Sequence, residues 1–122
     1  MKYLLIIHMN RGAWNALAET EREEMARGHR TFQESVGEAG ELISTHSLAD
    51  PLQSSVVRVR EGVVTVTTGP VHDSSPFPAG YYMVDCDSRG RAEELAAEIP
   101  DARIDGFGIE VRPVMVSSGE EM

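Results

Sequence analysis

A short loop between two predicted strands carries two titratable side chains, those of His72 and Asp73. The loop follows Gly69-Pro70 and contains two further prolines, which restrict its backbone. An imidazole can take up or release a proton near neutral pH, and a nearby carboxylate can support that transfer. Because adjacent residues of an extended segment point to opposite sides, the two need not pair with each other, and either could pair with another histidine (His8, His29 or His46) across a cleft. The alternative is an exposed polar loop without a chemical role.

His29 is a further candidate for proton transfer, and it lies on a predicted helix. It stands between Met25 and Phe32 at helical spacing, on the apolar face that should meet a sheet. We predict that His29 is the general acid or base, helped by Asp73 or His72. The alternative is a core histidine that bonds a backbone carbonyl or a water molecule.

Four other residues are expected to bind a small ligand: His8, Trp14, His46 and Tyr81. The two histidines lie near the ends of predicted strands, where a sheet opens onto the rim of a pocket. The aromatic rings offer apolar surface with a polar tip, as small-ligand sites usually do. Tyr81 and Tyr82 point to opposite faces of their strand, so at most one of them reaches the cleft. Ordinary packing in the core or in a dimer is the alternative for each ring.

Several kinds of site have no signature in this chain. No two histidines have the spacing of metal ligands on one helix or one strand. There is no phosphate-binding glycine loop, no dinucleotide fingerprint and no nucleophile elbow. Cys86 is the only cysteine, so an intrachain disulfide and a multi-cysteine metal site are excluded. We therefore expect neither a metal nor a cofactor.

The composition is that of a globular protein, with 41% hydrophobic and 25% charged residues. The formal net charge of -9 argues against nucleic acid and anionic membranes as partners. The apolar start of the chain is too short for a membrane span and lacks a cleavage site, so it predicts a strand and a cytoplasmic protein. A chain of 122 residues fits one domain.

Periodicity and turn residues place the elements that must position these side chains. A capping box of Thr20 and Glu23 is expected to start the first helix, which ends over residues 37–40. Ser88 caps a second helix that Pro100 stops, and residues 101–107 are a connector. Glu61-Gly62 joins a tight hairpin. The predicted strands span residues 2–8, 41–47, 55–60, 63–68, 79–86 and 108–116.

This order predicts a ferredoxin-like α+β domain, with one antiparallel sheet and two helices on one of its faces. The first strand is a nearly continuous apolar run, which favours a central position with both faces buried. Pro113 places the last strand at an edge. The uncovered face of the sheet needs a partner, and a second copy of the chain would supply one.

The sequence resembles the YCII-related family, and within it the branch named for an Asp-Gly-Pro-Phe signature. The resemblance rests on the order of MKYLLII, Trp14 before an acidic helix, VRVREGVVTVTTGP, AGYYMVD and IEVRPV. It implies a ferredoxin-like domain over residues 1–116 that pairs into a dimeric α/β barrel, and residues 117–122 are expected to be a flexible tail. The signature here reads Thr68-Gly69-Pro70-Val71, and Thr68 cannot replace an aspartate as a base.

Two functions follow from these expectations. The first is a cofactor-independent enzyme of the isomerase or lyase type, which acts on a small aromatic or lactone-like compound through a histidine and an aspartate. The second is a non-catalytic module that binds a small ligand or regulates a partner. A homodimer is expected in either case.

Overall fold

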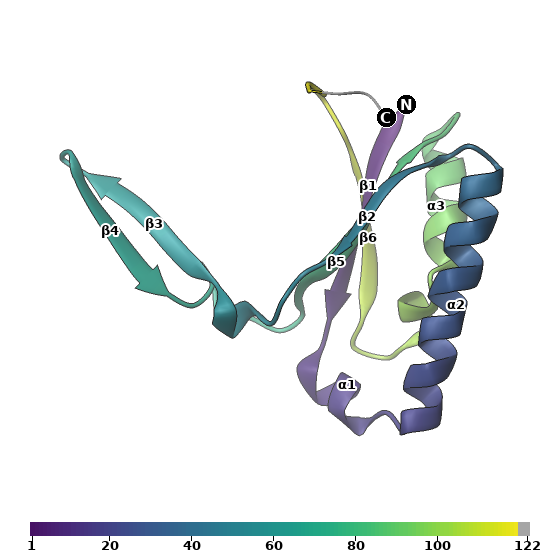
Figure 1. The fold of residues 1–122 in the computed structure, drawn as a ribbon, viewed down its shortest axis with the longest axis horizontal. Coiled ribbons are helices and arrows are strands. Elements are labelled where there is room, and N and C mark those ends of the chain that lie inside the picture. The colour runs from purple at the N-terminus through teal and green to yellow at the C-terminus, as the bar shows by residue number, and fades with distance from the viewer. Residues whose placement is uncertain (120–122) are drawn as a thin grey trace.

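The computed structural model describes residues 1–119, which form a four-stranded sheet with helices on one face and a separate hairpin (Figure 1). The predicted flexible tail lies partly outside the described residues. In chain order the strands are β1 (Lys2–Met9), β2 (Leu42–Ser47), β3 (Ser55–Arg60), β4 (Val63–Thr68), β5 (Phe77–Asp85) and β6 (Gly108–Pro113). The helices are α1 (Arg11–Ala16), α2 (Glu19–Glu38) and α3 (Arg89–Glu98), with short 3-10 turns η1 (Pro51–Gln53) and η2 (Pro100–Arg103).

The main sheet has the order β2-β5-β1-β6, and its neighbouring strands are antiparallel. With the hairpin set aside, this is the second, third, first and fourth strand, which is consistent with a ferredoxin-like arrangement. The predicted α+β class, the antiparallel sheet and the edge position of the last strand are confirmed. No helix among residues 1–119 is long and apolar enough to cross a membrane.

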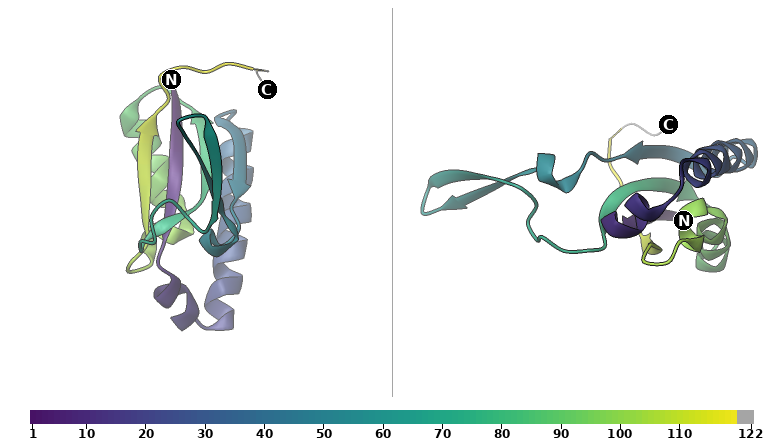
Figure 2. Two further views of the ribbon diagram at one scale, coloured as in Figure 1. Left: turned by 90° about the vertical axis from the view of Figure 1, so that its left-hand side faces the viewer. Right: turned by 90° about the horizontal axis from the view of Figure 1, so that it is seen from below.

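The hairpin of β3 and β4 forms a sheet of its own, which corrects the prediction of a single sheet. Figure 2 shows it reaching away from the main sheet and the helices. The turn at Glu61 and Gly62 has positive φ at both residues, as a tight hairpin turn requires. The chain enters this arm near Pro51 and leaves it at Pro70, and prolines cannot donate a ladder hydrogen bond. Pairing with the main sheet therefore stops on both sides of the arm.

The core lies between the sheet and the helices. Tyr3, Leu5 and Ile7 of β1 are buried, whereas the alternate residues Leu4 and Ile6 are only half-buried. The prediction that both faces of the first strand are buried is thus corrected, because no helix or strand of residues 1–119 covers the second face. The core is completed by side chains of β5, α2 and α3, among them Tyr82, Val84, Phe32, Val36, Leu95 and Ile99.

The two long helices begin in different ways. α3 starts as predicted, with the Ser88 hydroxyl accepting a hydrogen bond from the Arg91 N–H at 3.1 Å. The predicted capping box at Thr20 and Glu23 is wrong, because α2 already begins at Glu19. There the Glu21 side chain accepts the Ala18 N–H at 2.8 Å, so a carboxylate satisfies one of the free donors of the first turn.

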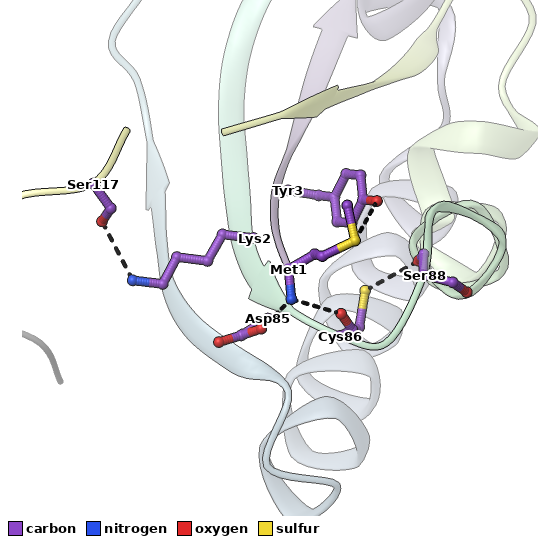
Figure 3. A network of polar contacts seen from close by, with 7 residues as sticks. All are labelled: Met1, Lys2, Tyr3, Asp85, Cys86, Ser88 and Ser117. Atoms are coloured by element: carbon purple, nitrogen blue, oxygen red, sulfur yellow. Dashed lines mark hydrogen bonds and ion pairs between the residues drawn. The ribbon is translucent and has the colours of Figure 1, made fainter. Parts of the chain in front are cut away.

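Figure 3 shows a polar cluster where β1 begins beside the end of β5. The amino group of Met1 lies 3.0 Å from Asp85 Oδ1 and 3.1 Å from the Cys86 carbonyl oxygen. The Cys86 thiol lies 3.5 Å from the Ser88 carbonyl oxygen. Burial raises the pKa of Cys86, so the sulfur stays a neutral thiol at neutral pH. This cluster ties strand ends together and leaves the thiol a poor nucleophile.

Candidate functional site

Three elements bring a carboxylate, an imidazole and a phenol into line. His29 of α2 places Nε2 at 2.6 Å from Oδ1 of Asp101, which lies in η2. Nδ1 of the same ring lies 2.7 Å from the hydroxyl oxygen of Tyr82 on β5. Gln33, one turn further along α2, donates to that hydroxyl at 3.1 Å. The chain of contacts therefore runs from Asp101 through His29 and Tyr82 to Gln33.

The polar groups of this network are buried, so leaving any of them without a hydrogen-bond partner would destabilise the fold. Asp101 is 4% exposed and is the one buried charged side chain among residues 1–119. A buried carboxylate is stable only when it is paired or hydrogen-bonded, and the His29 imidazole supplies that partner. Tyr82 is 2% exposed, and its ring meets Phe32 edge to face at 4.9 Å. The phenol is thus fixed by packing as well as by its hydrogen bonds.

The hydrogen-bonding capacities assign the positions of the protons. Burial is the largest influence on Tyr82 and raises the pKa of its phenol, which stays neutral at neutral pH. Tyr82 accepts from Gln33 and has its own O–H to donate to Nδ1 of His29. Nε2 then carries the hydrogen that the Asp101 carboxylate accepts. In this tautomer Nδ1 is the basic nitrogen, and Asp101 is placed to stabilise an imidazolium.

A glycine lets the elements come close enough for the contact between His29 and Asp101. Gly28 precedes His29, and Pro100 precedes Asp101. A Cβ atom added to Gly28 would lie 2.6 Å from Cγ of Pro100, well inside van der Waals contact. The absence of a side chain at residue 28 therefore sets the distance between α2 and η2.

We expect Gly28→Ala to destabilise the fold by about 1–3 kcal/mol, because the rigid proline ring must move. The same displacement would lengthen the contact between His29 and Asp101. Gly37→Ala is the matched control on the same helix, since nothing lies within 4 Å of its added Cβ. That change should stabilise the helix by about 0.5–1 kcal/mol. Urea denaturation measures the free energy of unfolding of both variants. Equal changes in the two variants would contradict the close contact between residue 28 and Pro100.

The network opens onto a cavity of about 460 Å³, a size that suits a small organic ligand. Apolar side chains from β1, α1 and α2 form part of its wall, and His29, Tyr82 and Asp101 all line it. Three predicted ligand-binding residues lie there as well. Trp14 lines the cavity, and so do His46 and Tyr81, whose Nδ1 and hydroxyl oxygen are 2.8 Å apart. The expectation that at most one of Tyr81 and Tyr82 reaches the cleft is wrong, because the cavity extends to the paired segments of β2 and β5 and both tyrosines line it.

The other predicted site residues lie elsewhere. His8 places Nε2 at 2.8 Å from Oε1 of Glu110, on the sheet face opposite the helices. His72 and Asp73 are exposed in the loop after the hairpin. His72 lines a second cavity of about 510 Å³, which is also lined by Leu48 and Phe77. Neither loop residue lines the cavity of His29, because the chain between β4 and β5 stays at the base of the arm.

Asp101, Tyr82 and Gln33 were not identified from the sequence as members of the site. The sequence pattern places residue 101 in a connector and favours Tyr81 over Tyr82 as a ligand-binding residue. One signal was present, because alternation places Tyr82 on the same strand face as Val84 and Cys86, whereas Tyr81 shares the other face with Asp85. An aspartate directly after a proline that stops an apolar helix is also placed near the core. Within residues 1–119, no three histidine, cysteine or acidic side chains are grouped to hold a metal ion.

Comparison with known proteins identifies the family of this domain. The model of the YCII-related domain matches residues 1–118. The chain belongs to the YCII-related family. An uncharacterised protein of Rhizobium meliloti (strain 1021) is 25% identical to it over 122 residues, which cover 100% of this chain and 98% of that protein.

The segment Thr68-Gly69-Pro70-Val71, which the sequence resemblance compares with the Asp-Gly-Pro-Phe signature, lies outside the cavity of His29. Thr68 ends β4, in the arm, and lines neither of the two cavities. Val71 lines the second cavity, together with His72. The signature positions are therefore separate from the network around His29. The absence of an aspartate at residue 68 removes no group from that network.

Proposed function

We propose that this protein is a cytoplasmic, cofactor-independent enzyme that moves a proton on a small molecule bound in the cavity of His29. The observation that carries this proposal is the buried chain of Asp101, His29 and Tyr82 in the wall of that cavity. A carboxylate that orients an imidazole, which in turn meets a hydroxyl group, is a recurring arrangement in acid–base catalysis.

The proposed proton path follows the assigned tautomer. Tyr82 is neutral in the resting site, so its oxygen can accept a proton from a ligand carbon only as its own proton passes to Nδ1 of His29. The ligand carbon keeps the electron pair of the broken C–H bond, and the positive charge appears on the imidazole. Asp101 stabilises that charge through Nε2. The reverse transfer returns a proton to the ligand.

Isomerisation and elimination are the reaction types that this path supports. Each needs a base that removes a proton from carbon and an acid that supplies one, and the same pair of side chains can serve in both steps. We propose a small aromatic or lactone-like compound as the substrate, because aromatic and apolar side chains line much of the cavity.

Deuterium exchange tests the proposal without knowledge of the net reaction. The protein is incubated in D₂O with a panel of small aromatic acids and lactones, and deuterium in each compound is measured by mass spectrometry. We expect at least one compound to gain deuterium at one carbon, and His29→Gln to abolish the gain. His72→Gln is the matched control and should exchange like the unaltered protein. Equal exchange by the unaltered protein and His29→Gln would contradict the proposal.

A non-catalytic ligand-binding module is the second candidate function. The observation that favours it is that both nitrogens of His29 are already engaged by residues of the same chain. In that case compounds from the panel bind saturably but gain no deuterium and yield no product.

We also propose that the protein works as a homodimer of the dimeric α/β barrel type, within the Asp-Gly-Pro-Phe branch of its family. The partly exposed sheet face, which carries Leu4, Ile6 and Met83, would pack against a second copy. This arrangement would bury apolar surface that a single chain leaves in contact with water.

The hairpin arm is the stronger support for this dimer. Cross-strand pairing joins Val57 with Val66 and Val59 with Val64, so the four valines share one face. They are 58–65% exposed. A two-stranded hairpin is only marginally stable by itself in water, and a projecting apolar face of this kind marks an interaction surface. The arm also carries Arg58 and Arg60, whose charge is complementary to a second copy with a net charge of -9.

A further inference from the structure

Arg22 brings a positive charge to the cavity of His29. It precedes His29 by two turns of α2, on the same face of the helix, and it lines the cavity. Its guanidinium lies over the ring of Trp14, with the carbon 4.9 Å from the ring centroid. Nη2 donates to the Trp14 carbonyl oxygen at 2.8 Å. The side chain is therefore held in place by α1 before any ligand binds.

The charge of Arg22 has no carboxylate partner within residues 1–119. Its position makes this unusual, because the start of α2 is rich in glutamates. Glu21, its neighbour in the sequence, bonds the backbone of Ala18 instead. Three other arginines, Arg11, Arg91 and Arg112, are each paired with a carboxylate. Arg22 thus lines the cavity with a guanidinium that no carboxylate of residues 1–119 neutralises.

A second observation concerns the same guanidinium. Nε of Arg22 is fully buried and has no hydrogen-bond partner in the described part of the chain. A buried donor without an acceptor is unfavourable, and it would be relieved if a shift of the guanidinium brought Nε to an oxygen atom of a bound ligand. A guanidinium presents its donors in a planar fork that matches the two oxygens of a carboxylate.

We propose that Arg22 binds the carboxylate of an organic acid whose apolar part fills the cavity. The acid lies between Arg22 and His29, whose Cα atoms are separated by about 10 Å along the helix axis. Ile7, Met9 and Met25 supply apolar surface along the cavity wall. This inference rests on the proposed function, because it assigns the ligand class of the same cavity, but it does not require that the ligand reacts.

Fluorescence offers a direct test, because Trp14 is the only tryptophan of the chain and stacks on Arg22. Benzoate, phenylacetate and cinnamate are titrated against the matched neutral amides and against inorganic phosphate. Calorimetry checks each affinity. We expect at least one acid to bind roughly tenfold more tightly than its amide and than phosphate.

Two variants of Arg22 test whether this side chain causes the preference for the acid over its amide. Arg22→Gln should remove the preference for the acid over its amide, and Arg22→Lys should retain part of it. Arg27→Gln is the control, since this exposed arginine of α2 does not line the cavity. Circular dichroism confirms that each variant is folded.

The outcomes separate this inference from the proposed enzymatic function. Equal binding of acids and amides, no saturable binding of any acid at millimolar concentration, or an acid preference that survives in Arg22→Gln would overturn the assignment. If inorganic phosphate bound as tightly as the acids, Arg22 would be assigned to anions in general and no longer to carboxylates. Acid-selective binding without deuterium exchange would leave the role of Arg22 intact and contradict the enzyme.

Discussion

Asp101→Asn is expected to slow proton transfer in the His29 cavity by roughly 10²–10⁴-fold. The asparagine amide has the shape of the carboxylate, so the packing around η2 should persist. Its NH₂ group can donate to Nε2, and this would move the imidazole hydrogen to Nδ1. Nδ1 then has no lone pair for the Tyr82 proton, and the imidazolium loses the charge that stabilises it. The measurement is the rate of deuterium exchange into a compound identified with the unaltered protein.

Asp73→Asn is the matched control, because it makes the same chemical change at the aspartate that the sequence favours. Asp73 is exposed and does not line the cavity, so we expect its exchange rate to stay unchanged. Tyr82→Phe supplies a second line of evidence, since it keeps the ring packed and removes only the hydroxyl. A large loss with Asp73→Asn and none with Asp101→Asn would move the catalytic carboxylate to the loop.

Val64→Asp is expected to convert the protein from a dimer to a monomer. Val64 is 62% exposed in the single chain, so the fold itself should tolerate the change. In the proposed dimer the new carboxylate would lie among Val57, Val59 and Val66 and would be buried without a partner. A cost of about 2–4 kcal/mol or more would weaken association by roughly 30-fold to 1,000-fold. Sedimentation velocity at micromolar concentration measures the change.

Thr65→Asp is the control for this prediction. It adds the same charge one residue further along β4, on the opposite face of the arm, across from Arg58. That variant should sediment as a dimer like the unaltered protein. The proposal fails if the unaltered protein is a monomer at micromolar concentration, or if Val64→Asp sediments as the dimer does.

Much of the fold could be predicted because the sequence signals for its turns and helix caps involve only a few neighbouring residues. The hairpin turn at Glu61-Gly62 and the cap at Ser88 each depend on a few neighbouring residues, and both are confirmed. The start of α2 was missed because Thr20 and Glu23 fit the capping-box pattern, whereas the observed N-cap Ala18 has no side chain that can accept a hydrogen bond. Only the packed structure shows that Glu21 is the one that accepts a backbone hydrogen bond.

The site was less predictable because its contacts are distant in the sequence. Asp101 lies 72 positions from His29, and no spacing rule links them. Tyr81 and Tyr82 both line the cavity, although alternation places them on opposite faces of β5. The loop of His72 and Asp73 drew attention because its residue types are reactive. This loop lies at the base of the hairpin arm, however, and is therefore distant from α2 and α3.

Gly28 and Pro100 bring α2 and η2 into close contact at one point. Directly beside it, His29 and Asp101 form a polar crosslink between the middle of α2 and the turn that ends α3. A ligand that draws the imidazole away from Asp101 would therefore also break the hydrogen bond that connects α2 with η2. Binding of a ligand in the cavity would therefore change the distance between α2 and η2, because Gly28 and Pro100 hold these two elements in close contact.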